Sequence, residues 1–421
     1  GQGGHPGQVL AAGHRLLLVA PDSEGPNPYA GNPHRREIRL PSVAIKGMQF
    51  RLAVGQDFDY RLAQIIANPP DVIHVHGFGP VCLLGLWAAQ RAGRPLVISW
   101  QTDLEAYAEH YWHLLPLLNA AYKVYHAHLT KSWPQLRNLR VKRPRRGGAQ
   151  VQLLQLAASM LTSADLVIAP SAKTARRVLE VAPQAKVRVV PTGADPLPPL
   201  APVPKGDGPR LLYVGRISAE KGIDLLLDAF ELVRDAIPQA ELMLVGDWRA
   251  ASVALRARLR QAANFGRVRL MGQVRHEELG AYLAGADVFV FPSMTDTQGI
   301  VLHDAANAGL PLVMCDDELR LVADPGVNAF LARPNPISLA QTIISTLDSL
   351  RNPEFAARAA ARSKELGAQY PIAGQAEQIL EIYRQLAGGQ PVEPTPGLEA
   401  AVGRRVFPGR RVNAEYSVPG S

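Results

Sequence analysis

The chain has 421 residues, more than one domain usually contains, so two domains with separate cores are expected. Hydrophobic residues make up 47% of the sequence and charged residues 19%, a balance that excludes a disordered protein. The net charge of +8 leaves nucleic acid, anionic membranes and phosphorylated substrates open as partners. With only Cys82 and Cys315, the sequence excludes a disulfide framework and favours a reducing, cytoplasmic compartment.

The first half of the chain alternates short apolar runs with helical patterns, which is typical of parallel βαβ units. Residues 1–7 have the composition of a loop, although a domain of this kind would ordinarily begin with a strand. The predicted strands lie at residues 15–20, 71–75, 95–100, 165–169 and 186–190. A parallel sheet covered by helices is therefore expected.

Two histidines mark the end of one predicted strand. His74 and His76 are two residues apart, so they share one face of the strand, and His76 lies at its carboxyl end, where ligands of such sheets bind. A structural role for His76 is the alternative to a site role. No third ligand is suitably spaced, so we expect no metal site.

The positive charge is densest between Lys131 and Arg146, where Pro144 and the following glycines break any helix. This basic segment predicts a surface loop. It lacks the interleaved aromatic residues of a nucleic-acid surface, so nucleic acid is not an expected partner. Peripheral contact with the inner face of a membrane stays open. No apolar run approaches the ~20 residues of a membrane span, and no signal-peptide pattern is present.

A proline-rich stretch at residues 196–204 separates the two halves, because each proline removes an amide donor and restrains its predecessor. Beyond it the alternation restarts. The predicted strands of the second half lie at residues 210–214, 241–245, 267–271, 287–291 and 311–315. Two doubly wound α/β domains joined by a flexible linker are expected, with the site in the cleft between them.

The expected boundaries follow from these patterns. They are an N-terminal domain over residues 1–198, a linker over 199–208, a C-terminal domain over 209–371, a helix over 372–387 that packs back on the N-terminal domain, and a Pro/Gly/Arg-rich tail over 388–421. The tail has no hydrophobic period, so we expect it to lie outside the folded unit.

A candidate phosphate site follows the strand at residues 210–214. Gly215 lets an anion approach the backbone, Arg216 follows it, and Lys221 stands at the start of a helix whose first amides are unpaired. Two cations and these amides can neutralise a diphosphate without metal ligands. The alternative is that both cations are ordinary surface charges.

A second polar stretch follows the strand at residues 287–291. It carries Asp296, Thr297 and Gln298 in a loop, Gly299 at the opening of a helix, and Asp304 within that helix. Carboxylates at a cleft accept hydrogen bonds from sugar hydroxyls, and the amides around Gly299 can face phosphate. Taken alone, either carboxylate can instead be a capping or solvated residue.

In order along the chain, these motifs resemble the retaining GT-B glycosyltransferases of family 4. In the second half the resemblance is carried by residues 214–216 (Val-Gly-Arg), 220–222 (Glu-Lys-Gly), 245–247 (Val-Gly-Asp), 276–279 (His-Glu-Glu-Leu), 286–293, 296–299 and 308–311. It extends more weakly to residues 71–80, 99–103, 164–171 and 189–193 in the first half. The arginine-rich, Ala/Gly/Pro-rich composition also resembles proteins of actinomycete-like bacteria.

The resemblance implies that the C-terminal domain holds a nucleoside-diphosphate sugar and the N-terminal domain holds a hydroxyl acceptor, a small-molecule natural product or a lipid. It implies transfer with retention of configuration, without a metal or a cofactor. Arg216 and Lys221 would bind the diphosphate, and Asp296 and Asp304 the sugar and ribose. The implied donor-binding residues are Gly215, Arg216, Lys221, Gly272, Val274, Asp296, Thr297, Gln298, Gly299, Ile300 and Asp304.

Two residues depart from the family pattern. Asp304 stands where glutamate is usual, and Gln101 stands where many relatives have a histidine beside the reacting sugar. A glutamine cannot act as acid or base near neutrality, so the role expected for Gln101 is positional. The expected acceptor-side residues are Gly4, from a segment that resembles the family's glycine loop, His76, Gln101, Thr102 and Asp103.

The residues implied in catalysis are Arg216, Lys221, Gln101 and Asp296. Two other functions share the diphosphate site: a GT-B nucleotide-sugar epimerase, which needs no acceptor, and a catalytically weak donor-binding partner subunit. Release of nucleoside diphosphate only when an acceptor is added would separate the transferase from both.

Overall fold

The computed structural model describes residues 4–22, 31–44, 51–53, 58–101, 119–120, 123, 127, 147–249, 251–264 and 266–398. The basic segment 131–146, Thr102, Asp103 and residues 399–421 lie outside this set. None of the described helices is both long enough and apolar enough to cross a bilayer.

In the described part of the first half the strands form three groups. Its elements are α1 (Gly4–Ala11), β1 (Leu16–Pro21), β2 (Arg35–Leu40), β3 (Ser42–Ala44), β4 (Arg51–Ala53), α2 (Phe58–Ile66), β5 (Ile73–His76), α3 (Pro80–Ala92), β6 (Leu96–Ser99), α6 (Gly147–Ser163), β7 (Leu166–Ala169), α7 (Ala172–Val181) and β8 (Val187–Val189). Strands β5, β6, β7 and β8 form a parallel sheet in that order, β1 and β2 form a separate parallel pair, and β3 and β4 an antiparallel pair.

The start of the chain differs from expectation. Residues 1–7 predict a loop, but helix α1 begins at Gly4. Pro6 lies in its first turn, where the backbone amides have no partner within the helix, so a proline costs nothing there. Strands β2, β3 and β4 were not expected, since charged residues interrupt β2 and the other two have three residues each.

The second half is a six-stranded parallel sheet. Its elements are β9 (Arg210–Val214), η2 (Ala219–Lys221), α8 (Ile223–Ala236), β10 (Glu241–Val245), α9 (Val253–Asn264), β11 (Val268–Gly272), η3 (His276–Glu278), α10 (Leu279–Ala284), β12 (Val288–Phe291), α11 (Ile300–Asn307), β13 (Leu312–Met314), β14 (Ala329–Leu331), α12 (Pro336–Ser349) and α13 (Pro353–Gly367). The order β11-β10-β9-β12-β13-β14 is that of the Rossmann fold.

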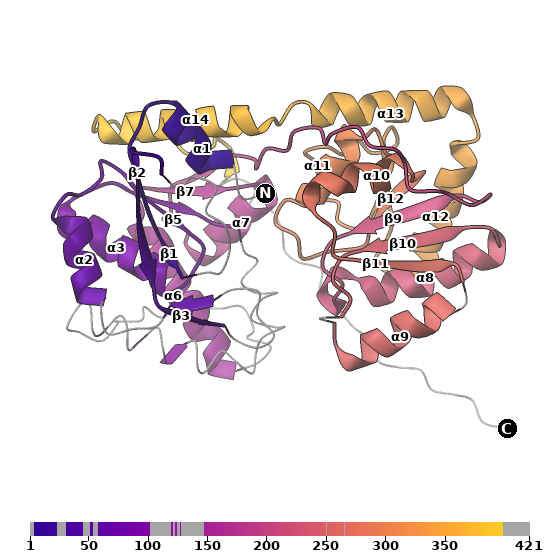
Figure 1. Ribbon diagram of the computed structural model, residues 1–421, viewed down its shortest axis with the longest axis horizontal. Helices are drawn as coiled ribbons and strands as arrows, with labels where there is room; N and C mark the ends of the chain where they lie inside the picture. The colour runs from indigo at the N-terminus through magenta and orange to yellow at the C-terminus, as the bar shows by residue number, and fades with distance from the viewer. Residues whose placement is uncertain are drawn as a thin grey trace.

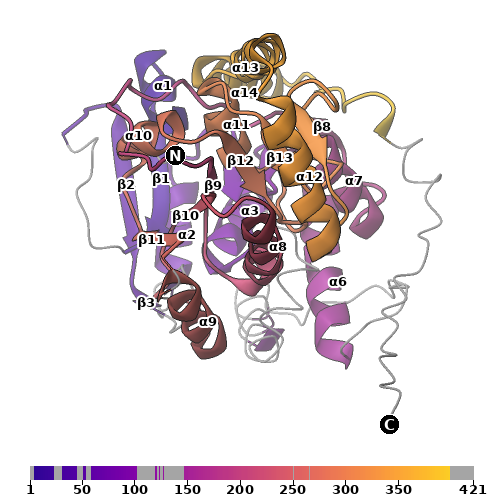
Figure 2. The same ribbon diagram turned by 90° about the vertical axis from the view of Figure 1, so that its right-hand side faces the viewer.

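Helices cover both faces of this sheet. One core joins it to α8, α9 and α12, and a second core on the other face joins it to α10, α11 and α13. Figure 2 looks onto this half and shows α8 and α12 side by side in front of its strands. Strands β9 and β12 are buried along their whole length, as strands of a parallel sheet covered on both faces should be.

Within residues 147–398, nearly all of which the structure describes, the chain crosses between the halves twice. The first crossing, residues 190–209, is largely exposed but is bonded to the second half near its end: the carbonyls of Val203 and Pro204 accept hydrogen bonds of 2.9 and 2.6 Å from the buried Arg210 guanidinium. The second crossing leads from α13 to α14 (Ile372–Ala387), which lies over the first half in Figure 1. There α14 packs on Val97, Leu166 and Ile168.

The two crossings are bonded to each other. The Ala194 amide donates to the Tyr370 carbonyl at 2.9 Å, and the Ile372 amide donates to Asp195 Oδ1 at 3.0 Å. A Cβ atom on Gly193 would lie 2.6 Å from the Ile372 Cα atom, so the two backbones are in direct contact. The connections between the halves therefore converge at one place.

The beginning of the C-terminal tail is part of the folded unit, although the sequence predicts that residues 388–421 lie outside it. Val392 and Leu398 are buried, and Thr395 extends the edge of the sheet at β8. Its amide donates to the Val187 carbonyl at 2.9 Å, and its hydroxyl accepts from the Val189 amide at 2.8 Å. Two scattered apolar residues and one threonine form no hydrophobic period, so the sequence alone does not predict that this segment packs on the sheet.

A buried lysine joins the two halves. Lys173, on α7 of the first half, is 5% exposed, and its Nζ atom donates to the carbonyls of Met294 and Asp296 and to Asp316 Oδ2, at 3.0, 2.8 and 2.5 Å. Nearby, Thr174 Oγ1 donates to the Thr297 carbonyl at 2.9 Å. Helix α7 thereby holds the loop that follows β12.

Gln298 forms a second junction. Its amide accepts from the Thr192 amide and donates to the Thr192 carbonyl, both at 2.8 Å, and its Nε2 lies 3.0 Å from His303 Nε2. An amide nitrogen can only donate, so the His303 ring accepts and is neutral. Burial lowers the pKa of His303 to about 4, which keeps it neutral at pH 7.

We expect Lys173→Met to lower the free energy of unfolding by about 3–5 kcal/mol, because it leaves Asp316 buried without its counter-ion. The double variant Lys173→Met/Asp316→Asn should recover much of this loss. Denaturant unfolding measures both. The control is Arg177→Met on the same helix, whose pair with Glu180 is solvent-exposed and worth under ~1 kcal/mol. Equal effects of Lys173→Met and Arg177→Met would contradict the assignment.

His303 should make stability depend on pH. Its pKa is about 4 when folded and ~6.5 when unfolded, so the unfolded chain binds a proton first as the pH falls. Stability contributed by the neutral ring is present above pH ~6.5 and is lost toward pH ~4, about 3 kcal/mol in all. In His303→Gln the loss between pH 7 and pH 4 should be smaller by this amount. The exposed His34→Gln variant should behave as wild type, and identical pH profiles for all three proteins would refute the prediction.

Candidate functional site

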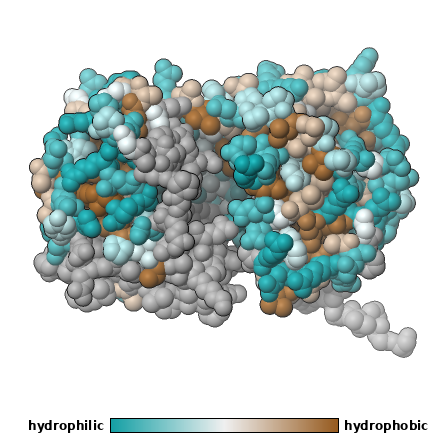
Figure 3. Space-filling view, viewed as in Figure 1, coloured by the Kyte–Doolittle hydropathy of each residue, from teal (hydrophilic) through white to brown (hydrophobic). Residues whose placement is uncertain are grey.

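The candidate site lies at the carboxyl edge of the second sheet, facing the first half. Figure 3 shows the surface hollowed between the halves. Strands β9, β10 and β11 end here in glycines: the Gly215 amide donates to the Val245 carbonyl at 3.0 Å, and the Gly246 amide donates to the Gly272 carbonyl at 2.9 Å. A Cβ atom on Gly246 would lie 1.9 Å from the Gly215 oxygen, so no side chain fits between these strand ends.

Arg216 and Lys221 lie on the turn that follows β9. The buried Tyr213 hydroxyl donates to the Arg216 carbonyl at 2.8 Å, which fixes the backbone of the turn, and burial raises the pKa of that hydroxyl well above its usual range. The Arg216 side chain is 44% exposed, with its guanidinium 3.4 Å from Glu220. Lys221 is mostly buried and points to the loop after β12.

The structure brings Lys221 and Asp296 together. Lys221 Nζ donates to Asp296 Oδ1 at 2.9 Å. The other oxygen, Asp296 Oδ2, is buried and has no hydrogen-bond partner in the part of the chain that the structure describes. A buried carboxylate oxygen without a donor is costly, so this atom is a position where a ligand hydroxyl would be favourable.

Asp304 is the second carboxylate of the site. Helix α11 begins after Gly299, whose backbone is left-handed with φ of 70°, and Asp304 lies buried in its second turn. Asp304 Oδ2 is 3.3 Å from His276 Nε2, whereas Oδ1 is buried without a partner among the described residues. Burial raises the pKa of Asp304, and the His276 ring lowers it in part.

His276 is a site residue that the sequence analysis did not single out. It lies on η3, after β11, and its side chain is 49% exposed beside Asp304. The only signal in the sequence was its position in the His-Glu-Glu-Leu motif. Its contact with a residue 28 positions further along depends on the fold.

Several other residues that were predicted to bind the sugar donor lie along the same edge of the sheet, and their side chains differ in solvent exposure. Gly272 ends β11 with φ of 74°, Val274 packs against the core, and Ile300 is 39% exposed at the start of α11. The Gln298 side chain, by contrast, faces Thr192 and His303, so its polar atoms are already bonded.

Across the cleft, Gln101 lies beside the same loop. It is exposed, and its carbonyl accepts a hydrogen bond of 3.4 Å from Thr297 Oγ1. The adjoining Thr102 and Asp103 lie outside the described residues. Gly4 begins α1, which packs beside α14.

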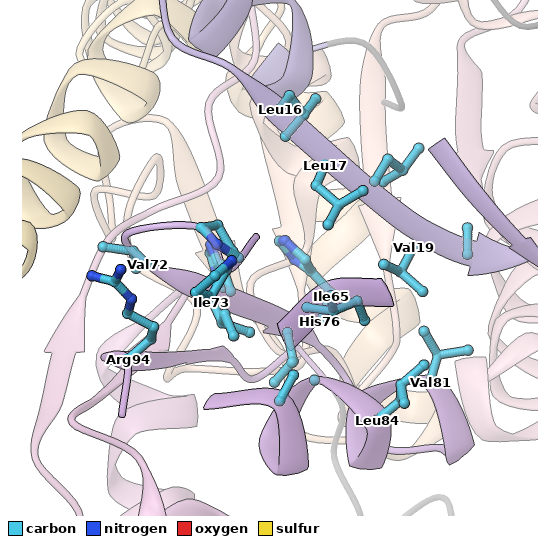
Figure 4. Close-up of a pocket in the computed structure, with 18 of the residues that line it drawn as sticks. Leu16, Leu17, Val19, Ile65, Val72, Ile73, His76, Val81, Leu84 and Arg94 are labelled. Carbon is cyan, nitrogen blue, oxygen red and sulfur yellow. The ribbon is translucent and has the colours of Figure 1, made fainter. Parts of the chain in front are cut away.

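His76 lines a cavity of the first half. It is exposed at the end of β5 and stacks on His74, with 4.2 Å between ring centres. His74 bonds to the Tyr383 hydroxyl at 2.5 Å and to the Ser99 hydroxyl at 2.8 Å. Both histidines line this cavity, which lies between β1 and β5 (Figure 4). Within the described residues, no group of three or more potential ligands could hold a metal ion.

Two family models match the chain. Residues 8–196 match the model described as Glycosyltransferase Family 4, and residues 208–349 match Glycosyl transferases group 1. Together they cover both halves, including β9 to β13 and the carboxylates of the site.

Curated relatives are similar over one or both halves. The sulfoquinovosyl transferase of Arabidopsis thaliana is 23% identical over 68% of this chain and 51% of its own length. The phosphatidyl-myo-inositol mannosyltransferase of Mycobacterium tuberculosis is 32% identical over 43% of this chain and 48% of its own length. The alpha-D-kanosaminyltransferase of Streptomyces kanamyceticus is 26% identical over 43% and 46%. The matched part of the chain thus spans about half the length of these relatives.

Solved structures share the fold. The sucrose-phosphate synthase from Thermosynechococcus elongatus has a TM-score of 0.65 and 23% identity, covering 91% of each chain. The Anabaena protein HepE, solved with UDP and glucose, has a TM-score of 0.61 and 18% identity, covering 88% of this chain and 100% of its own. The two Rossmann-like halves and the two matching family models lead to one assignment: the chain belongs to the GT-B glycosyltransferases, with a family 4 domain followed by a group 1 domain.

Proposed function

We propose that this protein transfers a sugar from a nucleoside-diphosphate sugar to a hydroxyl group of a small molecule or lipid, with retention of configuration. The observation that carries the proposal is the pair of buried carboxylate oxygens, Asp296 Oδ2 and Asp304 Oδ1, that have no partner among the described residues, together with the Lys221 ammonium that donates to Asp296. Cations for a diphosphate and acceptors for hydroxyls are the two chemistries that such a donor requires.

The relatives support this donor and acceptor chemistry. Their names describe transfer of sulfoquinovosyl, mannosyl and kanosaminyl groups, and one names a phosphatidylinositol. HepE was solved with UDP and glucose. One form of the proposal has a lipid acceptor, with peripheral membrane contact through the basic segment.

In the proposed reaction the diphosphate binds Arg216 and Lys221, while sugar and ribose hydroxyls donate to Asp296 and Asp304. The bond between the anomeric carbon and the diphosphate oxygen breaks as the acceptor oxygen bonds to that carbon from the same face. Because the acceptor attacks the anomeric carbon directly, no covalent enzyme intermediate forms. The acceptor proton passes to the departing phosphate oxygen. The negative charge that develops on the diphosphate is stabilised by Arg216 and Lys221, without a metal.

Gln101 and Lys173 position the reacting groups in this proposal. Gln101 presents a neutral amide at the cleft, opposite the loop that carries Asp296. Lys173 holds the same loop through the Met294 and Asp296 carbonyls, so the carboxylate of Asp296 is presented by a loop fixed from the other half.

Incubation with UDP-, GDP- and ADP-sugars, each with and without a panel of lipid and small hydroxyl acceptors, tests the proposed activity. We expect nucleoside diphosphate to appear only when an acceptor is present, and a chelator to change the rate less than about twofold. Epimerised donor without release would instead identify an epimerase. Loss of transfer with chelator and recovery with magnesium would overturn the metal-free mechanism.

Lys221→Ala should lower turnover by about 10²–10³-fold and donor affinity much less, because the charge that Lys221 stabilises grows as the bond breaks. Arg216→Lys should fall short of wild type, since an ammonium cannot bind phosphate bidentately. Steady-state kinetics and donor titration measure the two effects separately. The matched control is Lys205→Ala, a lysine of the first crossing that is ion-paired with Asp287 of the second half and should keep full turnover when replaced. Near wild-type turnover of folded Lys221→Ala would remove the diphosphate assignment.

A further inference from the structure

The buried carboxylate of Asp304 has two oxygen atoms in different situations. Asp304 is 5% exposed, and its Oδ2 atom lies 3.3 Å from His276 Nε2. A carboxylate can only accept a hydrogen bond, so the ring nitrogen donates. The other oxygen, Oδ1, is buried and has no hydrogen-bond partner in the part of the chain that the structure describes. Because a buried acceptor without a donor is costly, Oδ1 is the atom left for a hydroxyl of a ligand.

The turn that carries His276 is fixed at both of its ends. Before it, the Arg275 amide donates to Glu278 Oε2 at 3.2 Å, and the Arg275 guanidinium donates to Glu278 Oε1 at 2.9 and 2.7 Å. After it, α10 buries Leu279 and Leu283 in the core on one face of the second sheet. The His276 side chain is therefore presented from an anchored turn, at the end of the sheet where β11 stops.

A hydrogen bond from a fixed ring restricts the carboxylate that receives it. The terminal torsion angle of an aspartate has broad energy wells, so an unbonded carboxylate turns easily about its last bond. A donor on Oδ2 holds that torsion angle and thereby gives Oδ1 one direction. Burial raises the pKa of Asp304 and the His276 ring acts against this rise, so the ring also favours the ionised form, which accepts from hydroxyl groups.

The positions of the strands show which part of a donor this contact can serve. In the sheet order, β11 and β10 lie on one side of β9, and β12 lies on the other. The diphosphate of the proposed donor binds at the turn after β9 and joins sugar to nucleoside, so these two groups extend to opposite sides of that turn. Asp296 follows β12 and contacts Lys221, whereas His276 follows β11 and contacts Asp304. The contact between His276 and Asp304 therefore belongs to the nucleoside side.

We propose that His276 is a positioning residue for the nucleoside of the donor: it holds Asp304 Oδ2 so that Oδ1 accepts a hydrogen bond from a ribose hydroxyl. This inference rests on the proposed function, and in it His276 acts through Asp304 and not by touching the ligand. The ribose does not change when the glycosidic bond breaks, so the contact stabilises the ground state and the transition state equally. Its loss should weaken donor binding and leave turnover nearly unchanged.

The first test is calorimetric titration with UDP, GDP, ADP and dTDP, without sugar or acceptor, and with the 2′,3′-dideoxy form of the tightest binder. We expect His276→Ala to weaken binding of the parent nucleotide about tenfold, because the donor to a charged group is lost. Binding of the dideoxy form should change less than about twofold. His276→Gln, whose amide can donate to the same oxygen, should bind within about threefold of wild type. The matched control is Glu277→Ala, an exposed neighbour on the same turn, which should bind as wild type.

A double-mutant cycle and kinetics separate positioning from direct contact. In an Asp304→Ala background, His276→Ala should change affinity less than about twofold, because its effect passes through the carboxylate. In steady-state kinetics, His276→Ala should raise the donor KM about tenfold and change kcat less than about threefold. This is the opposite of the pattern expected for Lys221→Ala. Melting temperatures confirm that each variant is folded.

Wild-type affinity of folded His276→Ala for the parent nucleotide would overturn the role of His276 and leave the proposed function standing. Equal weakening by His276→Ala in both backgrounds would show that the ring touches the nucleotide itself, and would also overturn the positioning role. Absence of binding of all four nucleotides to the wild-type protein would overturn the proposed function, and this inference with it.

Discussion

The Lys173 side chain extends from the first half into the second half, where its ammonium group donates hydrogen bonds to three oxygen atoms. A buried charge is tolerated only when it is paired and fully hydrogen-bonded, and here Asp316 and the carbonyls of Met294 and Asp296 meet that condition. The loop after β12 is thereby tied to α7. Since that loop also presents Asp296 to Lys221, the geometry of the candidate site depends on a contact between the two halves.

Most of the fold could be predicted from the sequence because parallel strands buried on both faces are short, continuous apolar runs. Residues 210–214 and 241–245 coincide with β9 and β10, and the other predicted strands differ by a few residues at their ends. Strands without such a run were missed: β2 alternates charged and apolar residues, and β14 has only three residues. The helix α1 was missed because its first residues, Gly-His-Pro-Gly, have the composition of a loop.

The site was predictable where the chemistry is local and unpredictable where it depends on contacts between distant segments. Glycine at a strand end followed by two cations identifies the turn after β9 from the sequence alone. The pairing of Lys221 with Asp296, 75 positions apart, does not follow from any spacing. The same reason explains Gln298, a polar loop residue in the sequence, whose amide is bonded to Thr192 and His303 in the structure. It also explains why the role of His276 became visible only in the folded structure, where its ring lies beside Asp304.

The convergence of the two crossings has a mechanical consequence. Two connections that were far apart would resist almost any rotation between the halves, whereas two connections joined at Gly193, Ala194 and Ile372 act as a single pivot. Both connections keep their backbone contacts when the halves rotate about that pivot. The atoms that lie farthest from the pivot move the most. Because α14 packs on the first half while α13 packs on the second, the torsion angles that must change are confined to the few residues between these two helices and to residues 191–195.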